Sequence, residues 1–202
     1  MNNACGLIGE AAHSGAQLIV MPEFFNNEYF PQYRDPRYMH YAEPEDGPTQ
    51  SCIKAHARQH GVHIVSTIFE MARPGLYYDT AMLIEPDGEI VGKYRKVHPA
   101  ALLSLEKIYF RGGSSFPVFT VRGWRLGISM CYDNLFSESR LFPESCGSSA
   151  LNGAQLIIAP YAAPIDDPWE NFLSTRALSS AATPYRRRSA SKRASDNMPE
   201  LH

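Results

Sequence analysis

The sequence predicts an α/β fold made of two related halves, and two observations carry that prediction. The segment GAQLIVMP at 15–22 recurs as GAQLIIAP at 153–160, and each copy follows a stretch of helical character. The apolar runs inside both copies are too uniformly hydrophobic for half-exposed strands and are typical of strands buried on both faces. Two further segments, at 86–88 and around Gly123, carry the residues of hairpin turns. We therefore expect parallel and antiparallel strand pairs, with helices over the outer face of the sheet.

Each expected element has its own boundary signals. Gly15 and Gly153 suit the left-handed position that follows a helix, while Pro22 and Pro160 end the strands of the repeat. A helix is predicted at 48–60, where a proline is tolerated in the first turn and a glycine follows the last. The remaining expected elements are strands at 62–69, 77–84, 89–94, 116–121 and 125–130, and an amphipathic helix at 169–178.

Length and composition limit the class of protein. The 202 residues suffice for one well-buried domain, and 44% hydrophobic with 20% charged residues is typical of a soluble globular chain. A net charge of −2 gives no general attraction to nucleic acid or to anionic membranes. No apolar run approaches the roughly 18 residues of a membrane span, and no signal-peptide pattern is visible. Four cysteines without CxxC spacing disfavour a zinc ribbon, so we expect reduced thiols and a cytoplasmic location.

Residues 179–202 differ in composition from the rest of the chain. They hold five of the 19 basic and two of the 21 acidic residues, so this segment is basic and the remainder is acidic. Its sizeable apolar side chains are too few to offset the entropy of ordering. We therefore expect a domain at 1–178 and a disordered basic tail at 179–202. The arginines of the tail could contact nucleic acid, but a solvated tail without that function is favoured.

Reactive side chains follow three of the expected strands, at the sheet edge where sites of α/β proteins gather. Glu23 lies between a proline and two phenylalanines, where a desolvated carboxyl group would be a usable proton acceptor. Lys96 belongs to the cationic segment GKYRKVH. Cys131 follows a buried strand at a turn into a helix, and the helix N-terminus and a nearby lysine would favour its thiolate. Taken singly, these residues could instead be a surface glutamate, a solvated cation and an inert buried cysteine.

Together the segments LIVMPEFF, GKYRKVH and GISMCYD, in that order, resemble the carbon–nitrogen hydrolase (nitrilase) superfamily. The resemblance covers roughly residues 4–178 and implies an αββα sandwich with a catalytic triad of Glu23, Lys96 and Cys131. Glu106 matches the second glutamate of the family, which orients the lysine. The surrounding sequence is most similar to the N-carbamoyl amidohydrolases, which act on N-carbamoylputrescine, N-carbamoyl-amino acids or β-ureidopropionate.

The resemblance also implies a mechanism and partners. Cys131 would attack an amide or N-carbamoyl carbon, Glu23 would act as general base and then acid, and water would hydrolyse the acyl-enzyme. Lys96, held by Glu106, and the backbone N–H of Tyr132 would stabilise the oxyanion. We expect a small-molecule substrate, no cofactor and no metal. The oligomeric state stays open: relatives commonly pair through elements that cover the sheets, but their C-terminal part often contributes to that contact.

The chain also departs from the family pattern. The expected fold is incomplete at both ends, because the strand before the first helix and the strands after 178 have no counterpart here. LFSESR at 135–140 is followed at once by the near-duplicate LFPESC at 141–146, which predicts a bulge in the helix after Cys131. These departures favour an alternative, a truncated non-catalytic relative that acts as a binding partner or has no function.

Other candidate residues give weaker support for a functional site. The spacing HxxxHxxH of His56, His60 and His63 is disfavoured as a metal site, because no convergent carboxylate or cysteine accompanies it in the sequence. His98 is expected to pack beside Lys96. The segment 112–115 is expected to be a turn, and Tyr29 to line the substrate pocket or to pack.

Overall fold

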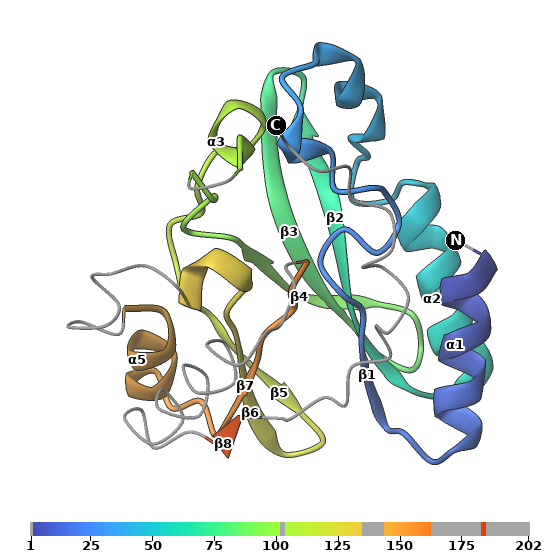
Figure 1. The fold of residues 1–202 in the computed structure, drawn as a ribbon. Coiled ribbons are helices and arrows are strands. Elements are labelled where there is room, and N and C mark those ends of the chain that lie inside the picture. Colours follow the sequence, from blue (N-terminus) through green and yellow to red (C-terminus); the bar gives the residue numbers. More distant parts are fainter. Residues whose placement is uncertain (1, 102–103, 135–143, 163–182, 185–202) are drawn as a thin grey trace, which may run out of the picture.

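Two four-stranded sheets lie face to face at the centre of the structure, a computed structural model that describes residues 2–101, 104–134, 144–162 and 183–184 (Figure 1). The first sheet has the order β1-β2-β3-β4 and the second β5-β6-β7-β8. The strands of the first are β1 (Leu18–Val20), β2 (His63–Arg73), β3 (Leu76–Ile84) and β4 (Ile90–Arg95). Those of the second are β5 (Val118–Val121), β6 (Trp124–Ile128), β7 (Leu156–Ile158) and β8 (Thr183–Pro184).

Helices cover the outer face of each sheet. On the first sheet, α1 (Asn2–His13) and α2 (Pro48–His60) run side by side, and α5 (Glu144–Leu151) lies on the second (Figure 1). The short elements are the helix α3 (Glu106–Tyr109) and the 3₁₀ turns η1 (Phe30–Gln32), η2 (Pro36–Tyr41) and η3 (Cys131–Asn134). The expected αββα sandwich is therefore confirmed. None of the helices in the described ranges combines the length and apolar character that a membrane crossing requires.

Both sheets mix strand directions as expected. β1 pairs with β2 in parallel, and β6 pairs in parallel with β7, with Ile19 opposite Ile64 and Gly127 opposite Ile157. The pairs β2–β3, β3–β4 and β5–β6 are antiparallel hairpins. The hairpin turns use glycine where φ is positive, at Gly88 (82°) and Gly123 (85°).

The repeated sequence forms equivalent units in the two halves. Each copy begins with a glycine in the left-handed region, Gly15 (φ 87°) after α1 and Gly153 (φ 90°) after α5. The apolar run that follows forms β1 in the first half and β7 in the second. The internal repeat therefore marks the same helix–turn–strand unit on opposite sides of the sandwich.

The core has two layers that follow the alternation of β2. Ile64 faces the helices and packs in a cluster with Ile8 of α1 and Ile53 of α2. Its neighbour Val65 faces the other way and packs in the cluster between the sheets, which contains Leu126 of β6. Since successive side chains of a strand point to opposite faces, one strand supplies both layers.

Several secondary-structure elements differ in extent or type from the prediction. β2 extends to Arg73 rather than ending at 69, because β3 pairs with it along almost its whole length. Cys131–Asn134 form a 3₁₀ turn, and the residues that follow, where the helix is predicted to continue, lie outside the described ranges. Thr183–Pro184 form β8 beside β7, so these two residues differ from the expected disordered tail. The predicted helix at 169–178, residues 135–143 of the two near-duplicate segments at 135–146, and the rest of the tail lie outside the described residues.

Candidate active site

Glu23 lies in the turn that follows β1. The carbonyl of Pro22 accepts a 2.7 Å hydrogen bond from the hydroxyl of Thr67 on β2, which fixes the start of the turn. Phe24 has a φ of 54°, in the left-handed region that is uncommon for residues other than glycine. Its ring packs edge-on against Phe30, with ring centroids 5.5 Å apart. This packing holds the strained backbone, and the Glu23 side chain is buried beneath it.

Lys96 follows β4 directly and points into the same buried region. Its Nζ donates hydrogen bonds to Glu23 Oε1 at 2.7 Å and to Glu106 Oε2 at 2.6 Å. Asp79 Oδ2, on β3, lies 3.6 Å from the same ammonium. The side chains of Lys96, Glu23 and Glu106 are all 0% exposed, so this ion cluster is shielded from bulk water.

Glu106 is fixed by contacts beyond the lysine. Its Oε2 also accepts a 2.8 Å hydrogen bond from the backbone N–H of Ala100. Its Oε1 lies 3.2 Å from the hydroxyl of Tyr29, which itself donates to Ser104 Oγ at 2.7 Å. Burial, with the Glu106 charge beside it, raises the pKa of Tyr29, so the phenol stays a proton donor. Glu106 is therefore a rigid support for the ammonium.

Gly113 holds the backbone of Lys96 from the other side. Its N–H donates to Lys96 O at 2.8 Å. A Cβ at Gly113 would lie 2.1 Å from the carbonyl oxygen of Arg95, so only glycine allows this approach. Residues 112–115, predicted to be only a turn, lie in an irregular segment, and Gly113 contributes there to the position of the lysine.

Cys131 lies where β6 leaves the second sheet, and is the first residue of η3. Its φ of 40° is again in the left-handed region, a strained conformation for a cysteine. Its N–H donates to the carbonyl oxygen of Pro160, just beyond β7, at 3.0 Å. The thiol is therefore held at the carboxyl ends of two parallel strands, the place predicted for a site in an α/β sheet.

Asp133 braces the turn around Cys131. Its Oδ2 accepts from the N–H of Met130 at 3.1 Å and from the buried hydroxyl of Tyr94. Its Oδ1 accepts from the N–H of His98 at 2.8 Å and lies 3.0 Å from Nδ1 of the same residue. The expected packing of His98 beside Lys96 therefore takes the form of a link from the chain after β4 to the turn of Cys131.

The thiol of Cys131 is kept neutral in this environment. Burial raises the pKa of Cys131 well above its ordinary value, and the charge of Glu23 raises it further. The charge of Lys96 acts in the opposite direction but does not compensate. Lys96 thus acts in the expected direction, but burial and the charges of Glu23 and Glu106 outweigh it in the resting site.

The charges of the ion cluster are also set by burial. Burial opposes the charge of Lys96, but the carboxylates of Glu23 and Glu106 outweigh it and hold the pKa of Lys96 well above its usual value. Burial and the charge of Glu23 raise the pKa of Asp79 well above its usual value, while the charge of Lys96 acts in the opposite direction. Glu23 Oε2 is buried and has no hydrogen-bond partner among the described residues.

The three carboxyl groups could also hold a metal ion by their spacing, since their ligand atoms lie within 4.8 Å of one another. The ammonium of Lys96 already lies within 3.6 Å of each of them and supplies the positive charge there. The arrangement therefore suits proton transfer and the stabilisation of a developing oxyanion rather than metal binding.

The structure thus brings Glu23, Lys96, Glu106 and Cys131 into one buried site, with Tyr132 directly after the cysteine. Sequence reasoning missed Asp79 and gave no role to Asp133. A signal for Asp79 was present, because it is a charged residue within the apolar strand LYYDTAMLI. The burial of Asp133 depends on Tyr94 and His98 and has no comparable signal in the sequence.

Known proteins share this sequence and this fold. The sequence pattern of the carbon-nitrogen hydrolase family matches residues 1–182. Omega-amidase NIT2-B of Xenopus laevis is 30% identical over 188 residues, which cover 88% of this chain and 64% of that protein. N-carbamoylputrescine amidase of Solanum lycopersicum is 32% identical over 84% of this chain and 55% of its own length. A nitrilase of Pyrococcus abyssi is 36% identical over 76% and 55%. The chain thus spans between about half and two thirds of these relatives.

Solved structures agree with the sequence relatives. A carbon-nitrogen hydrolase from Helicobacter pylori G27 superposes with a TM-score of 0.80 at 26% identity, over 90% of this chain and 64% of that one. A mutant amidase from Nesterenkonia sp. AN1, with acrylamide added to its active-site cysteine, superposes with a TM-score of 0.74 at 26% identity, over 90% and 68%. The match over nearly the whole chain and the shared fold lead to one conclusion: this chain belongs to the carbon-nitrogen hydrolase family.

Proposed function

We propose that this chain is a thiol amidohydrolase that cleaves a non-peptide C–N bond of an amide or N-carbamoyl substrate. The observation that carries the proposal is the buried cluster in which Lys96 joins Glu23 to Glu106 beside the thiol of Cys131. A hydrolase of this type needs a nucleophile, a proton shuttle and a positive group for the oxyanion. Each of these is supplied by one residue of the cluster.

In the first half-reaction, the thiol proton of Cys131 passes to Glu23 as the sulfur attacks the carbonyl carbon. Glu23 Oε2 suits this role, because its partner oxygen Oε1 is bound to Lys96 and Oε2 has no partner among the described residues. Lys96 and the N–H of Tyr132 stabilise the tetrahedral oxyanion. Glu23 then returns the proton to the departing nitrogen, and ammonia or an amine leaves the acyl-enzyme.

In the second half-reaction, water takes the place of the departed amine. Glu23 accepts a proton from this water as its oxygen attacks the acyl carbon, and the proton passes to the sulfur as the C–S bond breaks. Glu106 stays bound to Lys96 and keeps the ammonium in place. Proton transfers of this kind contribute on the order of 100-fold to 10,000-fold each.

The substrate class is proposed from the sequence resemblance and the relatives. N-carbamoylputrescine amidase and omega-amidase are both among the similar proteins, so both N-carbamoyl compounds and simple amides should be tested as substrates. The sequence around Glu106 favours the N-carbamoyl group, as stated above. Water is the second substrate.

The test is the release of ammonia from N-carbamoylputrescine, several N-carbamoyl-amino acids and simple amides. We expect release by the unaltered chain and none by Cys131→Ala, whose fold should be unchanged. Gly6→Ala is the control, because this position lies on the outer helix α1 and an added Cβ there meets open space. Release that persists in Cys131→Ala would overturn the assignment of the nucleophile. A folded chain with no Cys131-dependent release would favour the alternative, a non-catalytic relative.

Covalent labelling of the cysteines provides a second test of the proposed nucleophile that does not require turnover. Acrylamide and the acetamide moiety of fluoroacetamide add to the active-site cysteine in a glutamate-to-glutamine mutant of the Nesterenkonia amidase. With either reagent we expect a single adduct on Cys131, found by peptide mass spectrometry, before Cys52 reacts. Preferential labelling of Cys52 would contradict the proposed site.

A further inference from the structure

Two rows of side chains face each other along the contact between α1 and α2. Residues four apart lie on one face of a helix, and each row follows this spacing. The rows are Cys5, Gly9 and His13 on α1, and Cys52, His56 and His60 on α2. The rings of His13 and His60 pack edge-on with centroids 5.7 Å apart, and a Cβ on Gly9 would lie 3.6 Å from His60. The two rows are therefore in register, with the cysteines at one end.

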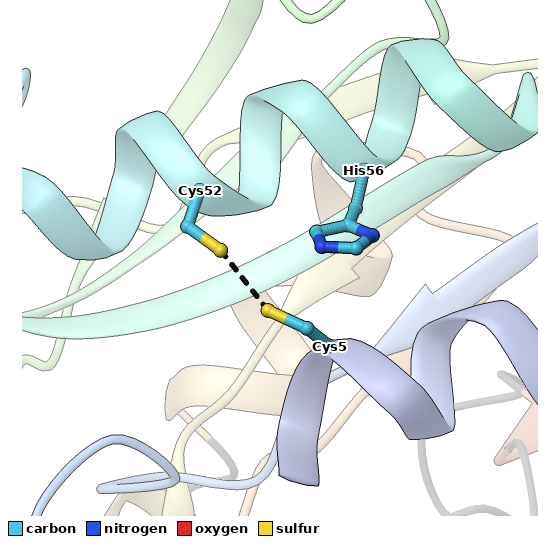
Figure 2. A group of neighbouring side chains, drawn as sticks. All are labelled: Cys5, Cys52 and His56. Carbon is cyan, nitrogen blue, oxygen red and sulfur yellow. Dashed lines mark hydrogen bonds between the residues drawn. The ribbon is translucent and has the colours of Figure 1, made fainter. Parts of the chain in front are cut away.

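A cluster of soft ligand groups forms at that end. The sulfur atoms of Cys5 and Cys52 lie 3.0 Å apart, both as free thiols. Figure 2 shows the imidazole of His56 beside them, one turn along α2 from Cys52, with a ring nitrogen on the side that faces the sulfurs. One ligand atom from each of the three residues lies within 4.8 Å of the other two. All three residues are half-buried, so an ion from solvent can reach them.

The ring of His56 stacks on that of His60, with centroids 5.8 Å apart, and this contact leaves one ring nitrogen available. The Nδ1 of His56 is buried and has no hydrogen-bond partner among the described residues. A buried ring nitrogen without a partner is unfavourable, and a metal bond to one nitrogen normally goes with a hydrogen bond from the other. The sequence expectation that no cysteine accompanies the histidines is wrong for His56, because the packing of α1 on α2 supplies two.

We propose that Cys5, Cys52 and His56 bind a Zn²⁺ ion between α1 and α2, separate from the site around Cys131. Thiolate sulfur and imidazole nitrogen are the ligands that zinc prefers, and a three-residue set leaves a fourth tetrahedral position for water. Among the described residues, no carboxylate of the kind that Mg²⁺ or Ca²⁺ prefers belongs to this cluster. His60 and His63, the other members of the sequence motif, are not in the cluster.

The geometry needs only a small adjustment. With Zn–S bonds of about 2.3 Å, two thiolates on one tetrahedral ion lie about 3.8 Å apart. The present separation of 3.0 Å therefore has to open by less than about 1 Å, which a small rotation of either side chain provides. The ion would then join the first helix of the chain to the second.

Binding must displace protons. Burial and the neighbouring Cys52 raise the pKa of Cys5 to about 11, so the metal-free thiol is protonated at neutral pH. Each thiol that becomes a ligand loses its proton, and the apparent affinity for zinc falls as the pH falls. His13 and His60, which face each other further along the same contact, are the nearest other titratable groups of the two rows.

The experiment uses the full chain in reduced form with Cys131→Ala, which removes the thiol of the proposed active site. We expect one Zn²⁺ per chain by competition with a coloured chelator, and a higher Tm when zinc is present. Co²⁺ in the same site should give thiolate charge-transfer absorption and visible bands typical of tetrahedral coordination. Cys5→Ser, Cys52→Ser and His56→Ala should each weaken Zn²⁺ binding by about 100-fold or more, because even the loss of an outer hydrogen-bond partner weakens metal sites by about 10- to 100-fold.

His13→Ala is the matched control, since it lies two turns from Cys5 on the same face of α1 and outside the cluster. We expect its zinc affinity to stay close to that of the parent chain. Equal affinities for His56→Ala and His13→Ala, or a Co²⁺ complex without thiolate absorption, would overturn the proposal. If a cysteine variant fails to fold, the proposal is tested by measuring the rate at which Cys5 and Cys52 of the parent chain are alkylated with and without Zn²⁺. Zn²⁺ must then slow the labelling of Cys5 and Cys52, and unchanged labelling rates would be equally decisive against the site.

Discussion

Removal of the ammonium at Lys96 should destabilise the fold in a way that depends on pH. The change Lys96→Met keeps the length and apolar stem of the side chain and leaves Glu23, Glu106 and Asp79 buried without a cation. An ion pair at 2.7 Å is worth about 6 kcal/mol at an effective dielectric constant of about 20. The carboxylates can avoid this loss only by taking up protons.

Proton uptake sets the size of the effect. Protonating a carboxyl group of ordinary pKa takes about 1 kcal/mol near pH 5 and about 5 kcal/mol near pH 8. The folded Lys96→Met chain holds at least one more carboxyl proton than the unfolded chain, so its free energy of unfolding falls as the pH rises. We expect a loss of about 3–5 kcal/mol near pH 8, the usual result of breaking a buried pair, and a much smaller loss near pH 5.

The assay is urea unfolding followed by far-UV circular dichroism at both pH values. Lys93→Met is the matched control, because Lys93 lies three residues earlier on β4, is partly exposed, and shares Glu70 with Arg95. Its loss should be about 1 kcal/mol with little pH dependence. A Lys96→Met chain that loses no more than this control, or loses the same amount at both pH values, would refute the reasoning.

Three further outcomes follow from the site and its supports. Glu23→Gln should reduce turnover by about 100-fold or more through loss of the base, yet lower the pKa of Cys131, read from the pH profile of alkylation, because the charge that raises it is gone. The Arg95 guanidinium and two other donors outweigh burial and lower the pKa of Glu70 to about 2, so its stabilisation is fully present above about pH 4.5 and is lost as the pH falls through about 2. Glu70→Gln should lose about 2 kcal/mol in urea unfolding at pH 7 and little near pH 2. Gly113→Ala should lower Tm and turnover together, because its Cβ would meet a carbonyl oxygen at 2.1 Å, whereas Gly6→Ala, with open space, should raise Tm slightly.

Local signals predicted most of the fold. The repeat around Gly15 and Gly153 could be interpreted because a left-handed glycine and a buried apolar run act over a few residues. The convergence of Glu23, Lys96 and Cys131 was predicted by the family resemblance, and strand ends gave it a physical reason.

What the sequence could not predict depends on contacts between distant segments. The raised pKa of Cys131 results from burial and from the carboxylates of Glu23 and Glu106, which lie in distant segments and outweigh the effect of Lys96. Asp79 becomes part of the site only because β3 pairs with β4 and places it 3.6 Å from Lys96 Nζ. Cys5 and Cys52 are 47 residues apart, and only the packing of two helices makes them neighbours.

The two sheets divide the proposed chemistry between them. Glu23 and Lys96 extend from strands of one sheet, and Cys131 extends from a strand of the other. The distance between thiol and base is therefore set by the thickness of the apolar layer around Val65 and Leu126. A substitution that creates a cavity in this layer would change the distance between the Cys131 thiol and the Glu23 carboxyl group. It would therefore alter the reactivity of the thiol at a smaller perturbation than the one that unfolds the protein. The reactivity of the Cys131 thiol thus reports on how closely the two sheets pack against each other.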